Sequence, residues 1–227
     1  MKAAFDQQQL IDMFAGASAR QGEQIRQAVR QAVLGALQGR ELSLKNIRDV
    51  LGTVTKAATA GAAQSGLPPV DVEKLLGSAV SGMDDALLKA VEANRVALQQ
   101  FVDQGVGLQE KQLKKAVDDL ERFEDTLIGV VKKSAEAASA QLGGPWSQVL
   151  EKLQAGGTMS GAQAASTAEQ LAEQMKTAMR DSRAAGLKAA QALAQSYTAL
   201  VSGVLIGMSD ALQQGGAGSA AKKTTRR

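Results

Sequence analysis

The chain of 227 residues contains no cysteine and no histidine. These absences exclude disulfides, zinc fingers, Cys- or His-ligated haem and iron–sulfur clusters, and every nucleophile or general base that depends on either residue. Aromatic residues are scarce, with four Phe, one Trp and one Tyr, and there are three prolines. Leu, Ile, Val and Phe together number 51. The composition therefore predicts a thin helical core rather than a thick globular one.

Long hydrophobic runs are also missing. The longest, from Ala199 to Met208, is interrupted by Ser202 and two glycines, and it is well short of the roughly 20 apolar residues that a membrane span needs. Near the start, Asp6 and three glutamines interrupt any apolar core of a secretory signal. We therefore predict a cytoplasmic protein with no transmembrane segment.

The excess positive charge is concentrated in a short tail. Lys and Arg number 26 against 23 Asp and Glu, and residues 216–227 lack helical periodicity, so we expect them to be disordered. The tail contains four candidate residues for an anionic partner: Lys222, Lys223, Arg226 and Arg227. For nucleic acid, four charges predict only weak, salt-sensitive binding, and a merely solubilising tail is the alternative.

Nearly every segment has the apolar spacing of an amphipathic helix, and none alternates as a strand does. We predict an all-α fold of long amphipathic helices in an elongated bundle or a coiled-coil-like array. An N-terminal region over residues 1–105 should contain about three helices. They are expected over about 6–38, from the N-cap Ser43 to about residue 65, and over about 71–105.

A C-terminal region over residues 106–215 should contain two longer helices, over about 108–142 and 160–213. The sequence Gly143-Gly144-Pro145 should end the first of them, because proline cannot continue a helix. Ser160, with a glutamine three residues later, has the pattern of a capping box for the second.

The two long helices carry an apolar stripe that could bind a hydrophobic surface or a partner helix. The stripe consists of Leu113, Val117, Leu120, Phe123, Leu127, Val131, Leu171, Met175, Leu193, Leu200 and Val204. Small residues dilute it, so such a face can either approach another helix closely or lie on a hydrophobic surface. Both interpretations are compatible if a loose bundle can open. Self-association into a homo-oligomer is also expected, since a long helix needs to cover its apolar face.

No motif for catalysis or cofactor binding is present. There is no P-loop and no dinucleotide-binding glycine motif. The adjacent acids Asp84-Asp85 and Asp118-Asp119 would point about 100° apart on a helix, so neither pair should converge on one metal or substrate. We therefore predict a protein that is not an enzyme and needs no cofactor or metal.

A weak internal repeat covers part of both regions. Gly52, Val54, Lys56, Ala58, Gln64 and Pro68 recur 77 positions later as Gly129, Val131, Lys133, Ala135, Gln141 and Pro145. The unit would be a helix, a proline-bearing break and a second helix, and chance identity in an Ala-rich chain is the alternative. The second break precedes Trp146, which either anchors a helix start in the core or lies at an apolar–water boundary.

Several of these features together resemble bacterial phasins. They are the long helices rich in Ala and Gln (41 and 24 residues), the absence of cysteine, the heptad-like segment from Leu113 to Leu142, and the basic tail after the linker Gly218-Ser219-Ala220-Ala221. Phasins are amphiphilic helical proteins that coat polyhydroxyalkanoate storage granules, and some carry basic tails that contact the nucleoid. The proline-broken repeat leaves a second interpretation, a separate phasin-like family of unknown function.

The resemblance implies a non-enzymatic protein that coats hydrophobic storage granules. Its partner would be a hydrophobic polymer or lipid surface, and it would be found in the cytoplasm at the granule surface. The alternative function is a soluble helical-bundle or coiled-coil scaffold that oligomerises or binds another protein. In that case the basic tail could add a weak contact to nucleic acid.

Overall fold

The structure is a computed structural model. It describes residues 7–18, 21–38, 43–103, 115, 118–120, 122–181 and 204, with side chains except in 101–103 and 174–181. Within these residues every regular element is an α-helix. The predicted all-α fold is therefore confirmed.

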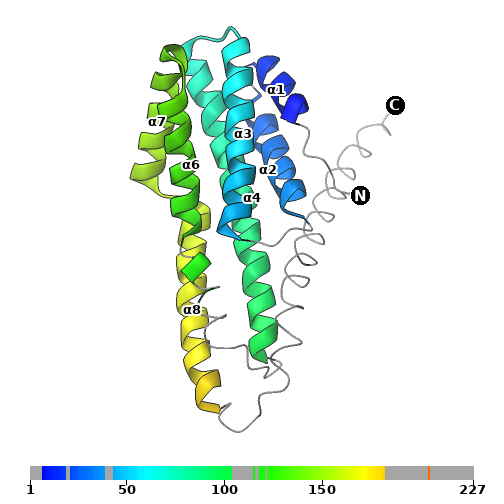
Figure 1. The fold of residues 1–227 in the computed structure, drawn as a ribbon, viewed down its shortest axis with the longest axis vertical. Helices are drawn as coiled ribbons and strands as arrows, with labels where there is room; N and C mark the ends of the chain where they lie inside the picture. Colours follow the sequence, from blue (N-terminus) through cyan, green and yellow to red (C-terminus); the bar gives the residue numbers. More distant parts are fainter. Residues whose placement is uncertain are drawn as a thin grey trace, which may run out of the picture.

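The described helices form three layers that run along the long axis of the molecule (Figure 1). They are α1 (Gln7–Ala15), α2 (Gly22–Leu37), α3 (Leu44–Gln64), α4 (Pro69–Asp103), α6 (Phe123–Ala137), α7 (Ala140–Gly156) and α8 (Met159–Asp181). Helices α1 and α2 pack on one side of the central pair α3 and α4, and α6, α7 and α8 pack on the other side. At 35 residues, about 50 Å, α4 is long enough to contact α2, α7 and α8.

One hydrophobic core joins the three layers. It includes Phe14 of α1, Leu76 of α4 and Trp146 of α7, each of them completely buried. Burying a large apolar side chain is worth about 1.5–3 kcal/mol relative to leaving it exposed. Residues from both predicted regions, 1–105 and 106–215, contribute to this one core.

Glycines allow two of the helix pairs to approach closely. A Cβ atom on Gly61 of α3 would collide with Phe14 of α1, and a Cβ atom on Gly82 of α4 would collide with the carbonyl oxygen of Arg26 in α2. At these two crossings the small residues therefore bring the helix backbones together.

In the N-terminal region the single helix expected over 6–38 is wrong. The chain forms α1 and α2, separated by a turn that begins at Gly16, and this division lets α1 pack on α3 while α2 packs on α4. The described part of this region thus has four helices instead of about three. The cap is confirmed, since Ser43 accepts a hydrogen bond from the N–H of Asn46 at 3.3 Å, and α4 begins at Pro69, two residues before the expected start near Asp71.

The break expected at Gly143-Gly144-Pro145 is also wrong. The helix expected over 108–142 ends earlier, because Ala138 is extended (φ −71°, ψ 148°), and α7 runs through the glycines and the proline. Reversing the chain at Ala138 brings Leu142 and Trp146 of α7 into the core. Proline near the start of α7 removes one backbone donor, and the burial of these two side chains offsets that loss.

The repeat-equivalent helices lie next to each other in the bundle. Helix α3 contacts α6, and α4 contacts α7. The second contact includes an ion pair of 2.5 Å between Glu73 of α4 and Lys152 of α7. The two prolines occupy different positions, since Pro68 precedes α4 whereas Pro145 lies inside α7.

Candidate functional site

The stripe predicted to bind a surface or a partner packs against the core of the chain wherever its side chains are described. The exposed fraction is 0% for Leu120, Phe123, Leu127 and Val131 and 2% for Leu171. Val204 is partly buried and packs against the same core. In the structure, other parts of the same chain therefore cover this face. The stripe is not free to bind a surface in this conformation.

The remaining predicted binding residues cannot be placed in the same way. Leu113, Val117, Leu193, Leu200, Lys222, Lys223, Arg226, Arg227 and the side chain of Met175 lie outside the described part of the chain. The predicted segments 160–213 and 216–227 are described only as far as Asp181, apart from Val204. The described portion of the stripe thus consists of Leu120, Phe123, Leu127, Val131, Leu171 and Val204.

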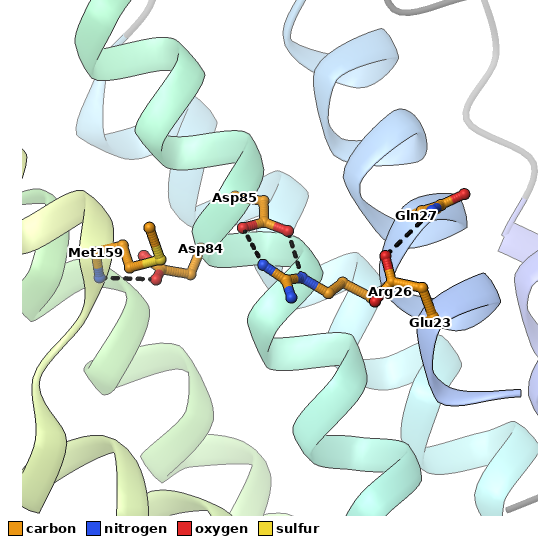
Figure 2. A network of polar contacts seen from close by, with 6 residues as sticks. All are labelled: Glu23, Arg26, Gln27, Asp84, Asp85 and Met159. Carbon is orange, nitrogen blue, oxygen red and sulfur yellow. Dashed lines mark hydrogen bonds and ion pairs between the residues drawn. The ribbon is translucent and has the colours of Figure 1, made fainter. Parts of the chain in front are cut away.

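Helix α8 begins at a polar junction to which α4 contributes an acid. The carboxylate of Asp84, 9% exposed, accepts a hydrogen bond from the backbone N–H group of Met159 at 2.8 Å (Figure 2). It accepts another from the backbone N–H group of Ser160 at 3.0 Å. The first N–H groups of a helix have no partner within the helix, and the helix dipole favours a negative charge near them. Asp84 therefore attaches the start of α8 to α4.

The N-cap of α8 is Thr158, so the predicted capping box at Ser160 is wrong. The hydroxyl oxygen of Thr158 accepts a hydrogen bond from the N–H of Gly161 at 2.8 Å. Thr158 also donates its N–H and its hydroxyl to one carboxylate oxygen of Glu124 in α6, at 2.8 and 3.0 Å. Just before it, Gly157 has a φ of 68°, a conformation that glycine adopts without strain. The start of α8 is thus held by acids from two other helices.

Asp85, the neighbour of Asp84, binds the opposite layer. Its two carboxylate oxygens accept hydrogen bonds from Nε and Nη2 of Arg26 in α2, at 2.6 and 2.8 Å (Figure 2). The hydrogen bond to Asp85, followed by the attraction of its charge, raises the pKa of Arg26 above its ordinary value, although burial acts in the other direction. Because the Arg26 side chain is 39% exposed, water screens the pair, which should contribute about 1 kcal/mol or less to stability.

The two adjacent aspartates thus point to different helices, which confirms that they do not converge on one ligand (Figure 2). Within the described residues, no group of three acidic side chains is placed to hold a metal ion. The arrangement supplies attachment between helices. We assign no chemical step to it.

Trp146 is a core residue of α7. Its side chain is completely buried, and its Nε1–H donates a hydrogen bond to the hydroxyl of Thr59 in α3 at 3.1 Å. Of the two interpretations of this residue, the position in the core is confirmed, but Trp146 lies inside α7 and not at a helix start.

Comparison with protein families gives one result for almost the whole chain. The model of a family of unknown function, DUF6781, matches residues 1–214. The chain belongs to this family. Comparisons with curated proteins and with solved structures gave no match. The DUF6781 match ends before the four tail cations, and in the described part of the chain no helix is long and apolar enough to cross a membrane.

The polar junction at the start of α8 was missed by sequence reasoning. Asp84 is 75 residues from Met159 and Glu124 is 34 residues from Thr158, so no local pattern connects either acid to the helix that it caps. The available signal was Thr158 itself, because threonine following Gly156-Gly157 is a good N-cap residue.

Proposed function

We propose that this member of the DUF6781 family is a non-enzymatic protein that coats hydrophobic storage granules, and that its bundle opens to do so. The resemblance to phasins supports the granule as the target, and the helices have the required amphipathic faces. In the closed bundle these faces cover one another. Coating therefore requires a layer of helices to separate from its neighbours, with polymer or lipid replacing the lost contacts.

One observation carries this proposal: the described stripe residues that belong to a helix of the bundle lie in one layer. Phe123, Leu127 and Val131 belong to α6 and Leu171 belongs to α8, and both helices pack on the central pair α3 and α4. Separation of the outer layer from the central pair would expose all of these side chains together. The apolar contact of the described part of α8, residues 159–173, is also weak, because two of its three buried apolar side chains are the alanines Ala164 and Ala168.

The polar contacts across this interface can be replaced by water. They include the hydrogen bonds from the start of α8 to Asp84 and the ion pair between Glu73 and Lys152. The free energy changes little when such groups exchange the hydrogen bonds between them for hydrogen bonds to water. Opening is therefore resisted mainly by apolar burial, which a hydrophobic surface would restore.

A covalent lock across the interface tests the proposal. The Glu73 carboxylate and the Lys152 amine are in contact at 2.5 Å, so a water-soluble carbodiimide should join them as an amide. Peptide mass spectrometry would verify the bond. The locked protein and the untreated protein are then floated with polyhydroxybutyrate particles at low and high salt. We expect the lock to reduce binding about tenfold or more, because it lowers the population of the open state.

The matched control is Lys152→Arg. Arginine keeps the charge at this position but does not form the amide, so the treated variant should bind particles as the untreated protein does. If the locked protein binds as well as the untreated protein, opening along this interface is not required and the proposal fails. If binding is lost at high salt, charges rather than the stripe hold the protein on the particle.

A second candidate function is a soluble helical scaffold that oligomerises or binds another protein. It is favoured by the described surface, on which Val70 and Met159 are the large hydrophobic residues that remain exposed, at 62% and 60%. This candidate predicts no binding to particles, cooperative unfolding, and a defined oligomer or a protein partner. The flotation experiment therefore separates the two functions.

A further inference from the structure

A groove with a volume of about 460 Å³ lies between the repeat-equivalent helices α3 and α6. This volume falls within the range of roughly 300–1,000 Å³ that is typical of small-molecule sites. Its walls are formed by Arg48, Gly52, Thr55, Lys56, Thr59 and Ala60 of α3 and by Val130, Lys133, Ser134 and Ala137 of α6. The groove is present in the closed bundle, so it does not depend on the opening proposed above.

The charge at the groove has one sign. Arg48, Lys56 and Lys133 are exposed, and the lining contains no acidic residue. None of the three cations forms an ion pair with any residue that the structure describes. Three positive charges around one opening, with no acid in its lining, favour an anionic group in the ligand.

The hydroxyl groups in the groove have no proton to offer a ligand. Thr55 donates to the carbonyl oxygen of Gly52, Thr59 to that of Thr55, and Ser134 to that of Val130, at 3.2, 2.7 and 3.0 Å. A sugar or a nucleobase has polar atoms along its whole body and would need donors beyond the three cations, and the lining has no aromatic ring on which a base could stack. The body of the ligand should therefore be apolar.

We propose that this groove binds the anion of a fatty acid. The three cations would hold the carboxylate, and the acyl chain would lie along the surface made by Gly52, Ala60 and Val130. Glycine and alanine leave the necessary space, since a Cβ atom on Gly52 would meet nothing within 4 Å.

The internal repeat explains why two lysines meet at this groove. Lys56 and Lys133 are equivalent positions of the repeat. Because the equivalent helices α3 and α6 are in contact, both lysines line one groove instead of two separate surfaces.

Titration with dodecanoate below its micelle concentration tests the proposal. The single Trp of the chain is a built-in reporter, because Trp146 donates a hydrogen bond to Thr59 in the groove wall. Isothermal titration calorimetry gives a second readout if the fluorescence does not change. We expect saturable binding of one dodecanoate, with dodecanol binding about tenfold more weakly because it lacks the charge. Inorganic phosphate, which lacks the acyl chain, should not displace dodecanoate.

Three variants separate this site from non-specific binding. Lys56→Gln combined with Lys133→Gln should weaken dodecanoate binding about tenfold, whereas Lys132→Gln, an exposed neighbour outside the groove, should leave it unchanged. Gly52→Leu should fill the groove and weaken binding without changing any charge. Circular dichroism and unfolding curves verify that each variant is folded.

The proposal is overturned by any of four results: no saturation, equal affinity for dodecanol, an equal effect of Lys132→Gln, or displacement by phosphate. Binding of an acidic peptide in place of dodecanoate, lost on removal of Lys56 and Lys133, would also overturn it and would make this face a protein-docking surface. None of these measurements uses hydrophobic particles, so their outcome is independent of the coating experiment.

Discussion

The two sides of α4 are attached to their neighbours in different ways, although Asp84 and Asp85 are adjacent in the sequence (Figure 2). On one side α2 contributes Ile25, Val29 and Val33 to the core, and Gly82 brings the two backbones together. On the other side, the described buried apolar side chains of α8 are Ala164, Ala168 and Leu171.

This difference has a consequence for stability. Each large aliphatic side chain contributes about 1.5–3 kcal/mol on burial, and alanine contributes much less. The described part of the α4–α8 interface therefore has less apolar packing than the α2–α4 interface, and its hydrogen bonds from Asp84 can be replaced by hydrogen bonds to water when the interface opens. We therefore expect the α4–α8 interface to open without unfolding of the rest of the bundle.

The largest expected effect comes from Gly82→Val. The added side chain would collide with the backbone of α2 at Arg26 and crowd Val29, and overpacking of this kind costs about 3 kcal/mol. Urea unfolding followed by circular dichroism at 222 nm measures the loss. An unchanged free energy of unfolding would show that the close contact between α2 and α4 is not important for stability.

The next effect is that of Asp84→Ala. It leaves the N–H groups of Met159 and Ser160 without an acceptor, so we expect a loss of about 2 kcal/mol, together with stronger binding to hydrophobic particles. Asp84→Asn keeps one carbonyl acceptor and should lose about half as much. The same unfolding and flotation experiments apply. Full stability of Asp84→Ala would contradict the role of this carboxylate.

Asp85→Ala should have a smaller effect, about 1 kcal/mol or less, because the ion pair with Arg26 is partly exposed to water. A double-mutant cycle with Arg26→Ala measures the coupling between the two side chains. The coupling should decrease at 0.5 M NaCl, because the electrostatic screening length falls toward about 3 Å as the salt concentration approaches about 1 M. A larger loss from Asp85→Ala than from Asp84→Ala would reverse the comparison.

The smallest effect is expected from Gly77→Ala, and it has the opposite sign. A Cβ atom on Gly77 would meet nothing within 4 Å, so this variant should gain about 0.5–1 kcal/mol from its better helix propensity. It is the matched control for Gly82→Val on the same helix. Destabilisation by Gly77→Ala, measured in the same unfolding experiment, would mean that α4 is sensitive to added side chains along its whole length.

The sequence predicted local features better than contacts between helices. The fold class, the cap at Ser43 and the start of α4 near Pro69 followed from local chemistry. The turn at Ala138 did not, because the choice between a break there and a break at Gly143-Gly144-Pro145 depends on the burial of Trp146 in a distant part of the bundle.

The candidate sites show the same limit. An amphipathic face indicates that a helix must cover its stripe, but it does not indicate whether another helix or a foreign surface covers it. The divergence of Asp84 and Asp85 followed from helix geometry, whereas the partners that they bind did not. The recurrence of Lys56 as Lys133 was visible in the sequence. It did not indicate a shared groove, because that also requires the contact between α3 and α6.

Native-state hydrogen exchange tests most directly the claim that the bundle opens at α8 before it opens at α2. Amide exchange would be measured as a function of low urea concentration and compared between Ala164–Leu171 and Val29–Leu34. The account predicts that the α8 amides exchange through an opening of lower free energy, and with a smaller urea dependence, than the α2 amides. Equal opening free energies and equal urea dependence in both helices would mean that the bundle unfolds as one unit and would contradict the account.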